Sequence, residues 1–214
     1  SDFRVKTLDG VADDWPIDYQ TLEPFYAEND RMMGVSGLAG DPDYPDKESL
    51  MRPVPLGKSG QVLARGFNSL GWHWWPSDSA VATEQYDGRD KCINLGLCGS
   101  GCAQGAKAST DITYWPHAIR NRVEVRTRCR VREITVDKSG LASGVIYYDG
   151  EGVEHELKAE VVVVACNGVG TPRLLLNSTS TAFPDGLANS SGLVGKNFMF
   201  HPYASVYGVF DDPL

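Results

Sequence analysis

Hydrophobic residues in the first half of the chain recur at helical spacing in two places. Residues 18–34 carry Leu22, Phe25 and Tyr26 on one face, and Asp18 stands where a helix N-cap is expected. Residues 61–70 repeat the pattern, and Gly71 is placed to end that helix. Nine glycines and prolines in residues 34–60 predict a long irregular segment between the two helices.

The second half changes to a strand pattern. Residues 123–137, 140–152 and 155–165 are rich in β-branched residues, and residues 138–140 and 149–152 have the composition of hairpin turns. This order predicts a β-meander. The run Val161–Val164 has no polar alternation, so we expect a strand buried on both faces in a parallel sheet covered by helices.

A glycine turn follows this valine run. Gly168 and Gly170 allow close approach of another group, and we expect a helix in which Pro172 occupies the first turn, Leu174–Leu176 pack inward and Arg173 faces outward. A strand that leads through glycines into a helix N-terminus is typical of anion and nucleotide sites, although a purely structural turn remains the alternative.

Composition excludes several classes of function. The chain has 214 residues, 42% hydrophobic and 22% charged, and a formal net charge of -8, which argues against a nucleic-acid surface. The basic residues from Arg120 to Arg132 alternate with valines and are expected on the solvent face of a hairpin. No apolar run approaches the roughly 20 residues that a membrane span needs.

Five cysteines at uneven spacing indicate reduced thiols rather than a disulfide framework. Cys92, Cys98 and Cys102 lie in a glycine-rich loop, where thiolates could hold an iron–sulfur cluster. A fourth ligand is not obvious, and small thiols lining a tight loop are the simpler interpretation, so we predict no metal.

Several blocks in order resemble the GMC family of flavoprotein oxidoreductases, the glucose, methanol and choline oxidases and their dehydrogenase relatives. They are ACNGVGTPRLLLNS, LVGKNFMFHPYA, the segment from Gly101 to Ile134 and the opening stretch from Gly10 to Gly37. The resemblance implies a mixed α/β fold: part of an FAD-binding Rossmann-like domain with a β-meander, and the start of an antiparallel-sheet substrate domain. It implies a loop-rich, helical segment over residues 1–109, the FAD-binding portion over 110–180, and the substrate-binding domain from 181 to 214.

The resemblance also implies which residues contact the cofactor. Val131 corresponds to a valine whose backbone addresses the adenine of FAD, and Ala165, Cys166, Asn167 and Gly168 form the turn beside the ADP portion. Thr171 and Pro172 would start the following helix. Lys107 could neutralise flavin or phosphate charge, with a plain surface lysine as the alternative, and Ser109 and Thr110 are expected to cap a helix through Ile112, Tyr114 and Ile119.

Two family features are missing from the sequence. No G-x-G-x-x-G loop occurs, and the catalytic histidine of the family would lie beyond Leu214, so the catalytic residue is unknown and we expect a partial polypeptide that is inactive by itself. His201 matches a family motif but is expected to be structural, and His73 could be a pocket residue or a flavin attachment point. We expect His117 in a helix and His155 on an exposed hairpin.

The resemblance implies FAD-dependent oxidation of an alcohol, with a sugar or polyol as a candidate substrate, by hydride transfer to the flavin. The partners would be that substrate and the remaining segments of the enzyme, with no nucleic acid. A non-catalytic structural subunit or binding module of a multi-chain flavoprotein is the alternative. A cytoplasmic location is favoured over the periplasm, and the electron acceptor and the mode of FAD attachment are not specified by the sequence.

Overall fold

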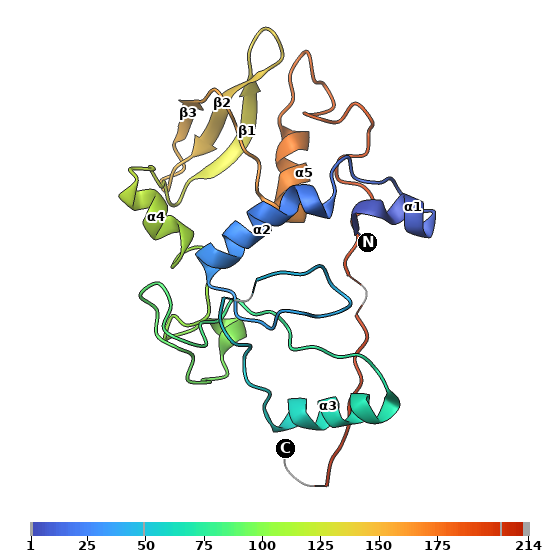
Figure 1. The fold of residues 1–214 in the computed structure, drawn as a ribbon. Coiled ribbons are helices and arrows are strands. Elements are labelled where there is room, and N and C mark those ends of the chain that lie inside the picture. Colours follow the sequence, from blue (N-terminus) through green and yellow to red (C-terminus); the bar gives the residue numbers. More distant parts are fainter. Residues whose placement is uncertain (1, 49, 202, 212–214) are drawn as a thin grey trace. The chain divides into compact units, whose positions relative to one another are not determined.

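The computed structural model describes residues 2–48, 50–201 and 203–211, and it combines helices with one small antiparallel sheet (Figure 1). The chain divides into two compact units. The first unit is Ser1–Glu124 with Phe210–Leu214, and the second is Val125–Val209. The prediction of a mixed fold is therefore confirmed, whereas the borders after residues 109 and 180 stay a prediction.

Helices make up the regular structure of the first unit. They are η1 (Asp2–Arg4), α1 (Val5–Asp9), α2 (Tyr19–Met33), α3 (Lys58–Leu70), η2 (Cys98–Ser100) and α4 (Tyr114–Arg120). The capping prediction for α2 is confirmed, because Asp18 Oδ1 accepts the Thr21 N–H at 2.8 Å. Gly34 ends α2 with φ 64°, in the left-handed conformation that glycine adopts without strain.

Helix α3 also agrees with the sequence pattern, although it begins three residues before Gln61. Gly71 ends it at φ 68°, and the Trp72 N–H reaches back to the Phe67 carbonyl. The segment between α2 and α3 has no helix or regular strand among its described residues, as predicted. It is held by isolated bridges of Ser36 to Met51 and to Ser79.

The predicted caps of α4 are wrong. The helix begins at Tyr114, and Thr113 precedes it without a capping hydrogen bond from its side chain. Ser109 lies in the turn before the helix, where its hydroxyl donates to Asp111 Oδ1 and its carbonyl accepts the Thr113 N–H. The acidic neighbour two residues away competes for the serine hydroxyl, so a local turn forms where a cap was expected.

The second unit contains a three-stranded antiparallel sheet, in the order β1 (Arg130–Val136), β2 (Ala142–Tyr148) and β3 (Glu154–Lys158). The predicted meander and both of its turns are confirmed. The register between β1 and β2 shifts between Val131 and Glu133, which leaves Arg132 as the extra residue of a bulge.

Helix α5 (Asn167–Asn177) lies alongside β1 (Figure 1). The buried Ser178 joins the two elements. Its hydroxyl group accepts a hydrogen bond from the Ile134 N–H at 2.9 Å and donates one to the Leu174 carbonyl. Helix α5 starts at Asn167, so Pro172 lies in its second turn rather than in the first, and the prediction that Thr171 and Pro172 start the helix is wrong. Arg173 faces outward as expected.

The prediction of a buried strand at Val161–Val164 is wrong for this chain. Residues 161–165 form no strand, and the side chains of Val161 and Val163 are 75% and 83% exposed. A strand of a parallel sheet needs a neighbour for its backbone groups, and in the described ranges β1 to β3 pair only with one another. The extended valines therefore lack the neighbouring strands that would bury them.

The described residues expose much more surface than their number requires. The accessible surface is 16594 Å². Two separate compact domains of these lengths would together expose about 12,000 Å². Residues 198–209 contribute strongly through exposed Met199, Phe200, Tyr203, Val206 and Val209. Large apolar areas thus lie open in each unit, and no helix in the described ranges has the length and apolarity needed to cross a membrane.

Candidate functional site

The side chain of Asn167, in the turn that precedes α5, caps the N-terminus of this helix. Asn167 adopts φ 61°, and its Oδ1 accepts the N–H groups of Val169 and Gly170 at 2.9 and 3.1 Å. These are the second and third positions after an N-cap, so the side chain of Asn167 does the capping although the helix is assigned from that residue onward. Asparagine tolerates the left-handed conformation better than most residues, so it can adopt this φ value with little strain.

The same turn leaves two backbone donors open. The Cys166 N–H bonds Thr171 Oγ1 at 3.1 Å, whereas the N–H groups of Asn167 and Gly168 have no partner among the described residues. Ala165, Cys166, Asn167 and Gly168 are exposed, and Thr171 is half-buried. The structure thus brings the predicted site residues 165–168 and 171 together in one turn that presents two free amides.

A groove runs from this turn along α5. It has a volume of about 710 Å³ and lies between the helix and residues 195–199. The two sequence blocks that follow the valine run therefore lie side by side. The approach is close, because a Cβ on Gly168 would lie 2.9 Å from the ring of Phe198, and a Cβ on Gly195 would lie 3.2 Å from Leu176 Cδ1.

The charged residues of the groove are cationic. Arg173 and Lys196 line it, and no aspartate or glutamate is among its lining residues. The remaining lining residues are mostly apolar, including Val169, Pro172 and Met199. Two cations, open amides and a glycine without a side chain suit a phosphate-bearing ligand with an apolar portion.

Val131 lies in the same unit, on β1. It pairs with Tyr147 and directly precedes the bulge at Arg132, and its side chain is partly exposed. A bulge leaves backbone groups outside the regular ladder, as a backbone contact to a ligand requires. The role of Val131 in binding adenine stays a prediction.

Lys107 belongs to the first unit. Its backbone forms a bridge with Val81, inside a short ladder that buries Ala82, Ala106 and Ala108. Its side chain is half-buried and lines a small cavity of about 60 Å³ together with Cys92, Cys98 and Cys102. The predicted role of Lys107 beside the flavin stays a prediction.

The three cysteines of this loop face one cavity but do not gather their sulfur atoms. Within the described ranges, the one group of three ligand atoms within 4.8 Å of one another comes from other residues. Backbone N–H groups of Lys107, Gln104, Ala106 and Gly105 hold the pKa of the Cys102 thiol below its ordinary value, against a smaller opposing effect of desolvation. The geometry thus shows separate thiols, and the amides around Cys102 favour its ionised form.

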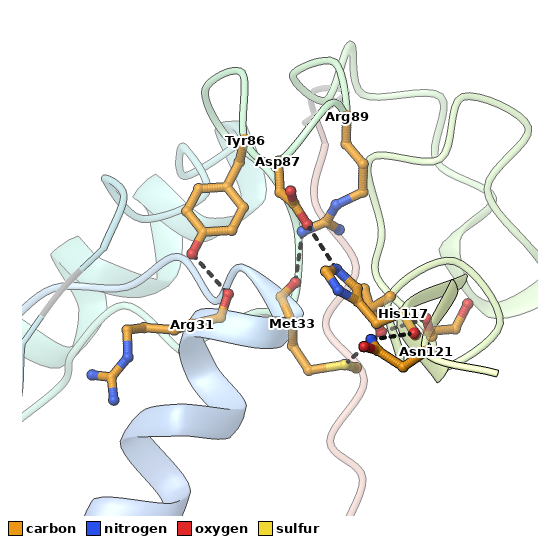
Figure 2. A network of polar contacts seen from close by, with 9 residues as sticks. Arg31, Met33, Tyr86, Asp87, Arg89, His117 and Asn121 are labelled. Atoms are coloured by element: carbon orange, nitrogen blue, oxygen red, sulfur yellow. Dashed lines mark hydrogen bonds and ion pairs between the residues drawn. The ribbon is translucent and has the colours of Figure 1, made fainter. Parts of the chain in front are cut away.

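A network around Arg89 holds this region to α2. Figure 2 shows the Arg89 guanidinium directed at the Met33 carbonyl and the Tyr86 hydroxyl directed at the Arg31 carbonyl, at 2.7 Å each. These carbonyls belong to the last turn of α2, where the regular helical hydrogen bonds end. The Arg31 carbonyl also accepts the Gly34 N–H at 3.3 Å. The Nε of Arg89 is buried without a hydrogen-bond partner in the part of the chain that the structure describes.

The four histidines occupy different surroundings. His117 lies in α4 and His155 lies on the exposed strand β3, so their predicted positions are confirmed. Nε2 of His117 is 3.8 Å from Asp87, and Nε2 of His155 is 2.7 Å from Asp149. His201 is exposed, and its neighbour Pro202 lies outside the described residues. His73 approaches Asp41 and Asp43.

Some features of the site were not found from the sequence. The groove wall formed by Lys196 and Phe198 depends on how residues 195–199 fold back on α5, which no local pattern indicates. The capping role of Asn167 had a local indication in the Asn-Gly pair, a common turn dipeptide. The contact of His73 with aspartates had a weaker indication in the sequence, namely the alternating Asp41 and Asp43.

Comparison with known proteins adds three relatives. The chain is 47% identical over 205 residues to 2-methyl-1,2-propanediol dehydrogenase of Mycolicibacterium austroafricanum, covering 94% of this chain and 37% of that protein. It is 31% identical to the fructose dehydrogenase large subunit of Gluconobacter japonicus over 94% of this chain and 38% of the relative. It is 31% identical to paromamine 6'-oxidase of Streptomyces fradiae over 93% and 36%. The chain thus spans little more than a third of the length of these relatives.

The family model for GMC oxidoreductase matches residues 51–203, well over half of the chain. That range includes the β-meander, the capped turn before α5 and the groove beside it. The resemblance drawn from the sequence blocks is confirmed by this match. The chain therefore belongs to the GMC oxidoreductase family.

Proposed function

We propose that this chain forms part of an FAD-dependent enzyme that oxidises an alcohol group, and that the turn and groove of α5 hold the ADP half of the cofactor. The family is generally flavin-dependent, and its N-terminal domain has an FAD-binding Rossmann-like fold. The observation that carries the proposal is the groove lined by Arg173 and Lys196, together with the open amides of Asn167 and Gly168 in the turn beside it.

The residues present fit a dinucleotide in part. The amides of Val169 and Gly170 are already bonded to Asn167, so two amides rather than four are left for phosphate oxygens. The two cations supply the remaining charge, and Gly168 leaves room beside Phe198. When bound, FAD supplies the acceptor for the hydride of the alcohol. This chain contributes binding and orientation of the cofactor, and we assign it no proton-transfer step.

We further propose that other segments of the same enzyme complete the site. The exposed Val161 and Val163, and the apolar residues of 198–209, are surfaces that neighbouring strands would cover. The named relatives are dehydrogenases and an oxidase of a diol, a sugar and an amino sugar derivative, so a small polar alcohol is the proposed substrate class. A purely structural role is disfavoured by the cationic groove, which packing alone does not require.

Equilibrium titration of the purified protein with FAD tests the proposal through flavin fluorescence. We expect Arg173→Gln and Lys196→Gln each to weaken FAD binding about tenfold, the order expected for a charge-assisted contact to phosphate. Lys138→Gln, which removes an exposed lysine in the β1–β2 turn outside the groove, is the matched control and should change nothing.

Riboflavin, which has neither phosphate nor adenine, separates the two halves of the cofactor. If the groove holds the ADP half, the two groove variants should leave riboflavin binding unchanged. Equal effects on FAD and riboflavin, or no effect on either, would overturn the assignment of the groove.

A further inference from the structure

Three metal-ligating side chains meet in the first unit, in a place that the proposed flavin site does not use. Asp41, Asp43 and His73 each offer one ligand atom, and these atoms all lie within 4.8 Å of one another. His73 Nε2 is 2.9 Å from Asp41 Oδ1 and 3.5 Å from Asp43 Oδ2. The two aspartates come from the irregular segment after α2, and the histidine comes from the aromatic residues 72–75 after α3, thirty or more positions away along the chain.

The spacing of the three atoms is close to that of a tetrahedral metal site. With ligand distances of 2.0–2.2 Å, neighbouring ligand atoms of a zinc ion are about 3.3–3.6 Å apart. Asp43 Oδ2 lies within this range at 3.5 Å from His73 Nε2, and Asp41 Oδ1 lies somewhat closer at 2.9 Å. Small side-chain rotations would therefore place all three atoms around one ion, with a fourth position left for water.

The surroundings hold the ligands in place before any ion binds. Trp75 stacks on the ring of His73 and donates from Nε1 to the Leu38 carbonyl at 2.8 Å, which joins the two segments next to the site. An ion pair between Lys47 and Asp78 joins the same two segments again. A preorganised site loses less conformational entropy on binding, so these contacts favour affinity.

Burial is graded across the site. The side chain of Asp41 is 13% exposed, that of His73 is 40% exposed, and that of Asp43 is 63% exposed. Asp41 thus lies at the inner end, and an ion can enter from the side of Asp43. His117 differs from His73 in this respect. It faces one carboxylate, that of Asp87 at 3.8 Å, and has no second acidic partner among the described residues.

We propose that Asp41, Asp43 and His73 bind a divalent transition-metal ion of the zinc class, which fastens the irregular segment after α2 to residues 73–75. The mixed donor set decides the class of ion. One imidazole with two carboxylates suits zinc and its neighbours in the first transition row, whereas Ca²⁺ and Mg²⁺ prefer oxygen ligands alone and a larger number of them.

Titration of the purified metal-free protein with ZnCl₂ tests this proposal by calorimetry, and CoCl₂ supplies a spectroscopic probe. We expect one zinc site that is lost or weakened at least about tenfold in His73→Gln and in Asp43→Asn. His73→Gln can keep a hydrogen bond to Asp41 but is a poor zinc ligand. Asp43→Asn changes an exposed side chain, so it should leave folding intact. The matched control is His117→Gln, which should bind zinc as the parent does.

The cobalt spectrum separates this site from the thiols of the neighbouring loop. Co²⁺ bound by nitrogen and oxygen should give visible bands of a tetrahedral site without the ultraviolet charge-transfer absorption of a thiolate ligand. Zinc binding that survives unchanged in His73→Gln, or a thiolate band that accounts for all bound cobalt, would overturn the proposal. Absence of zinc binding at micromolar concentration would show that the three residues form an ion-pair cluster alone.

Limited trypsin digestion gives a readout independent of the binding measurement. Lys47 is a cleavable position in the segment that the ion would fasten, whereas Arg52 precedes Pro53 and resists trypsin. Zinc should slow cleavage after Lys47 several-fold in the parent and in His117→Gln, and should have no effect in His73→Gln. Equal protection of all three proteins would contradict the proposal.

Discussion

The guanidinium of Arg89 donates a hydrogen bond from Nη2 to the backbone carbonyl of Met33 at 2.7 Å. This contact satisfies one of the carbonyls that α2 leaves without an intrahelical partner, and it joins the end of α2 to the turn at residues 86–89. Nη1 of the same side chain reaches the Ala106 carbonyl, next to Lys107. Arg89 therefore connects α2 with the end of the loop that carries the three thiols.

Replacing Arg89 with lysine should destabilise the first unit. Lysine keeps the charge but cannot reach two carbonyls with one planar group, so we expect a loss of about 1–3 kcal/mol in the free energy of unfolding. Chemical denaturation followed by tryptophan fluorescence measures this change. Arg31→Lys is the control, because the Arg31 side chain makes no hydrogen bond or ion pair in the described parts of the chain, and it should change stability by less than about 0.5 kcal/mol.

Gly34→Ala should cost more than the same change at the end of α3. Gly34 and Gly71 both end helices with left-handed φ values of 64° and 68°. A Cβ at Gly71 would meet nothing within 4 Å, whereas one at Gly34 would overlap Arg89 Nη2 and the ring of Tyr86. We expect about 1 kcal/mol of lost stability for Gly71→Ala from backbone strain, and about 2–4 kcal/mol for Gly34→Ala.

Equal losses for the two alanine variants would mean that Tyr86 and Arg89 move aside without cost. Denaturant midpoints of the two variants and of the parent, measured in one buffer, decide between these outcomes.

Acid should destabilise the β2–β3 hairpin through Asp149. Its Oδ2 accepts a hydrogen bond from His155 at 2.7 Å, and its Oδ1 accepts the Val153 and Glu151 N–H groups, so these contacts lower the pKa of Asp149. A carboxyl with a lowered pKa in the folded state contributes stability above its unfolded pKa, near 3.9, and that contribution is lost as pH falls through the lower folded value.

Asp149→Asn should therefore reduce stability at pH 7 and flatten the loss of stability below about pH 4. Glu151→Gln changes the same turn at a side chain that makes no hydrogen bond or ion pair in the described parts of the chain, so it should leave the acid slope as it is in the parent. Thermal unfolding followed by circular dichroism between pH 2.5 and 7 gives both slopes. Parallel curves for the parent and Asp149→Asn would contradict the role of this carboxylate.

Local sequence patterns predicted the elements whose stabilising groups are close in sequence. The cap of α2 at Asp18, its end at Gly34 and the two hairpin turns depend on residues within four positions of one another. The valine run at Val161–Val164 failed because burial of a parallel strand depends on neighbours that no local pattern contains. The predicted caps of α4 failed because Asp111 competes for the hydroxyl of Ser109.

The candidate site divides in the same way. The glycine turn was readable in residues 165–171, because small residues before a helix leave backbone groups accessible, and its role in anion binding stays a prediction. The groove could not be predicted from the sequence, because Lys196 and Phe198 reach α5 through the fold of residues 178–195. The grouping of Asp41 and Asp43 with His73 likewise joins segments far apart in sequence, and only the folded chain brings them together.

Asn167 offers a test that separates stability from cofactor binding. Asn167→Asp keeps an acceptor for the Val169 and Gly170 N–H groups and tolerates a positive φ, so stability should change by less than about 0.5 kcal/mol. Its carboxylate, however, lies at the turn where the phosphates are proposed, and repulsion should weaken FAD binding about tenfold or more.

Asn167→Ala should behave in the opposite way, because it loses the cap and strains the backbone but adds no charge. We expect it to cost about 1–3 kcal/mol in stability, with a smaller effect on FAD affinity at temperatures where it stays folded. Denaturant unfolding and FAD titration of the same two variants provide both numbers. Tight FAD binding by Asn167→Asp would place the phosphates away from this turn, whatever the groove beside it holds.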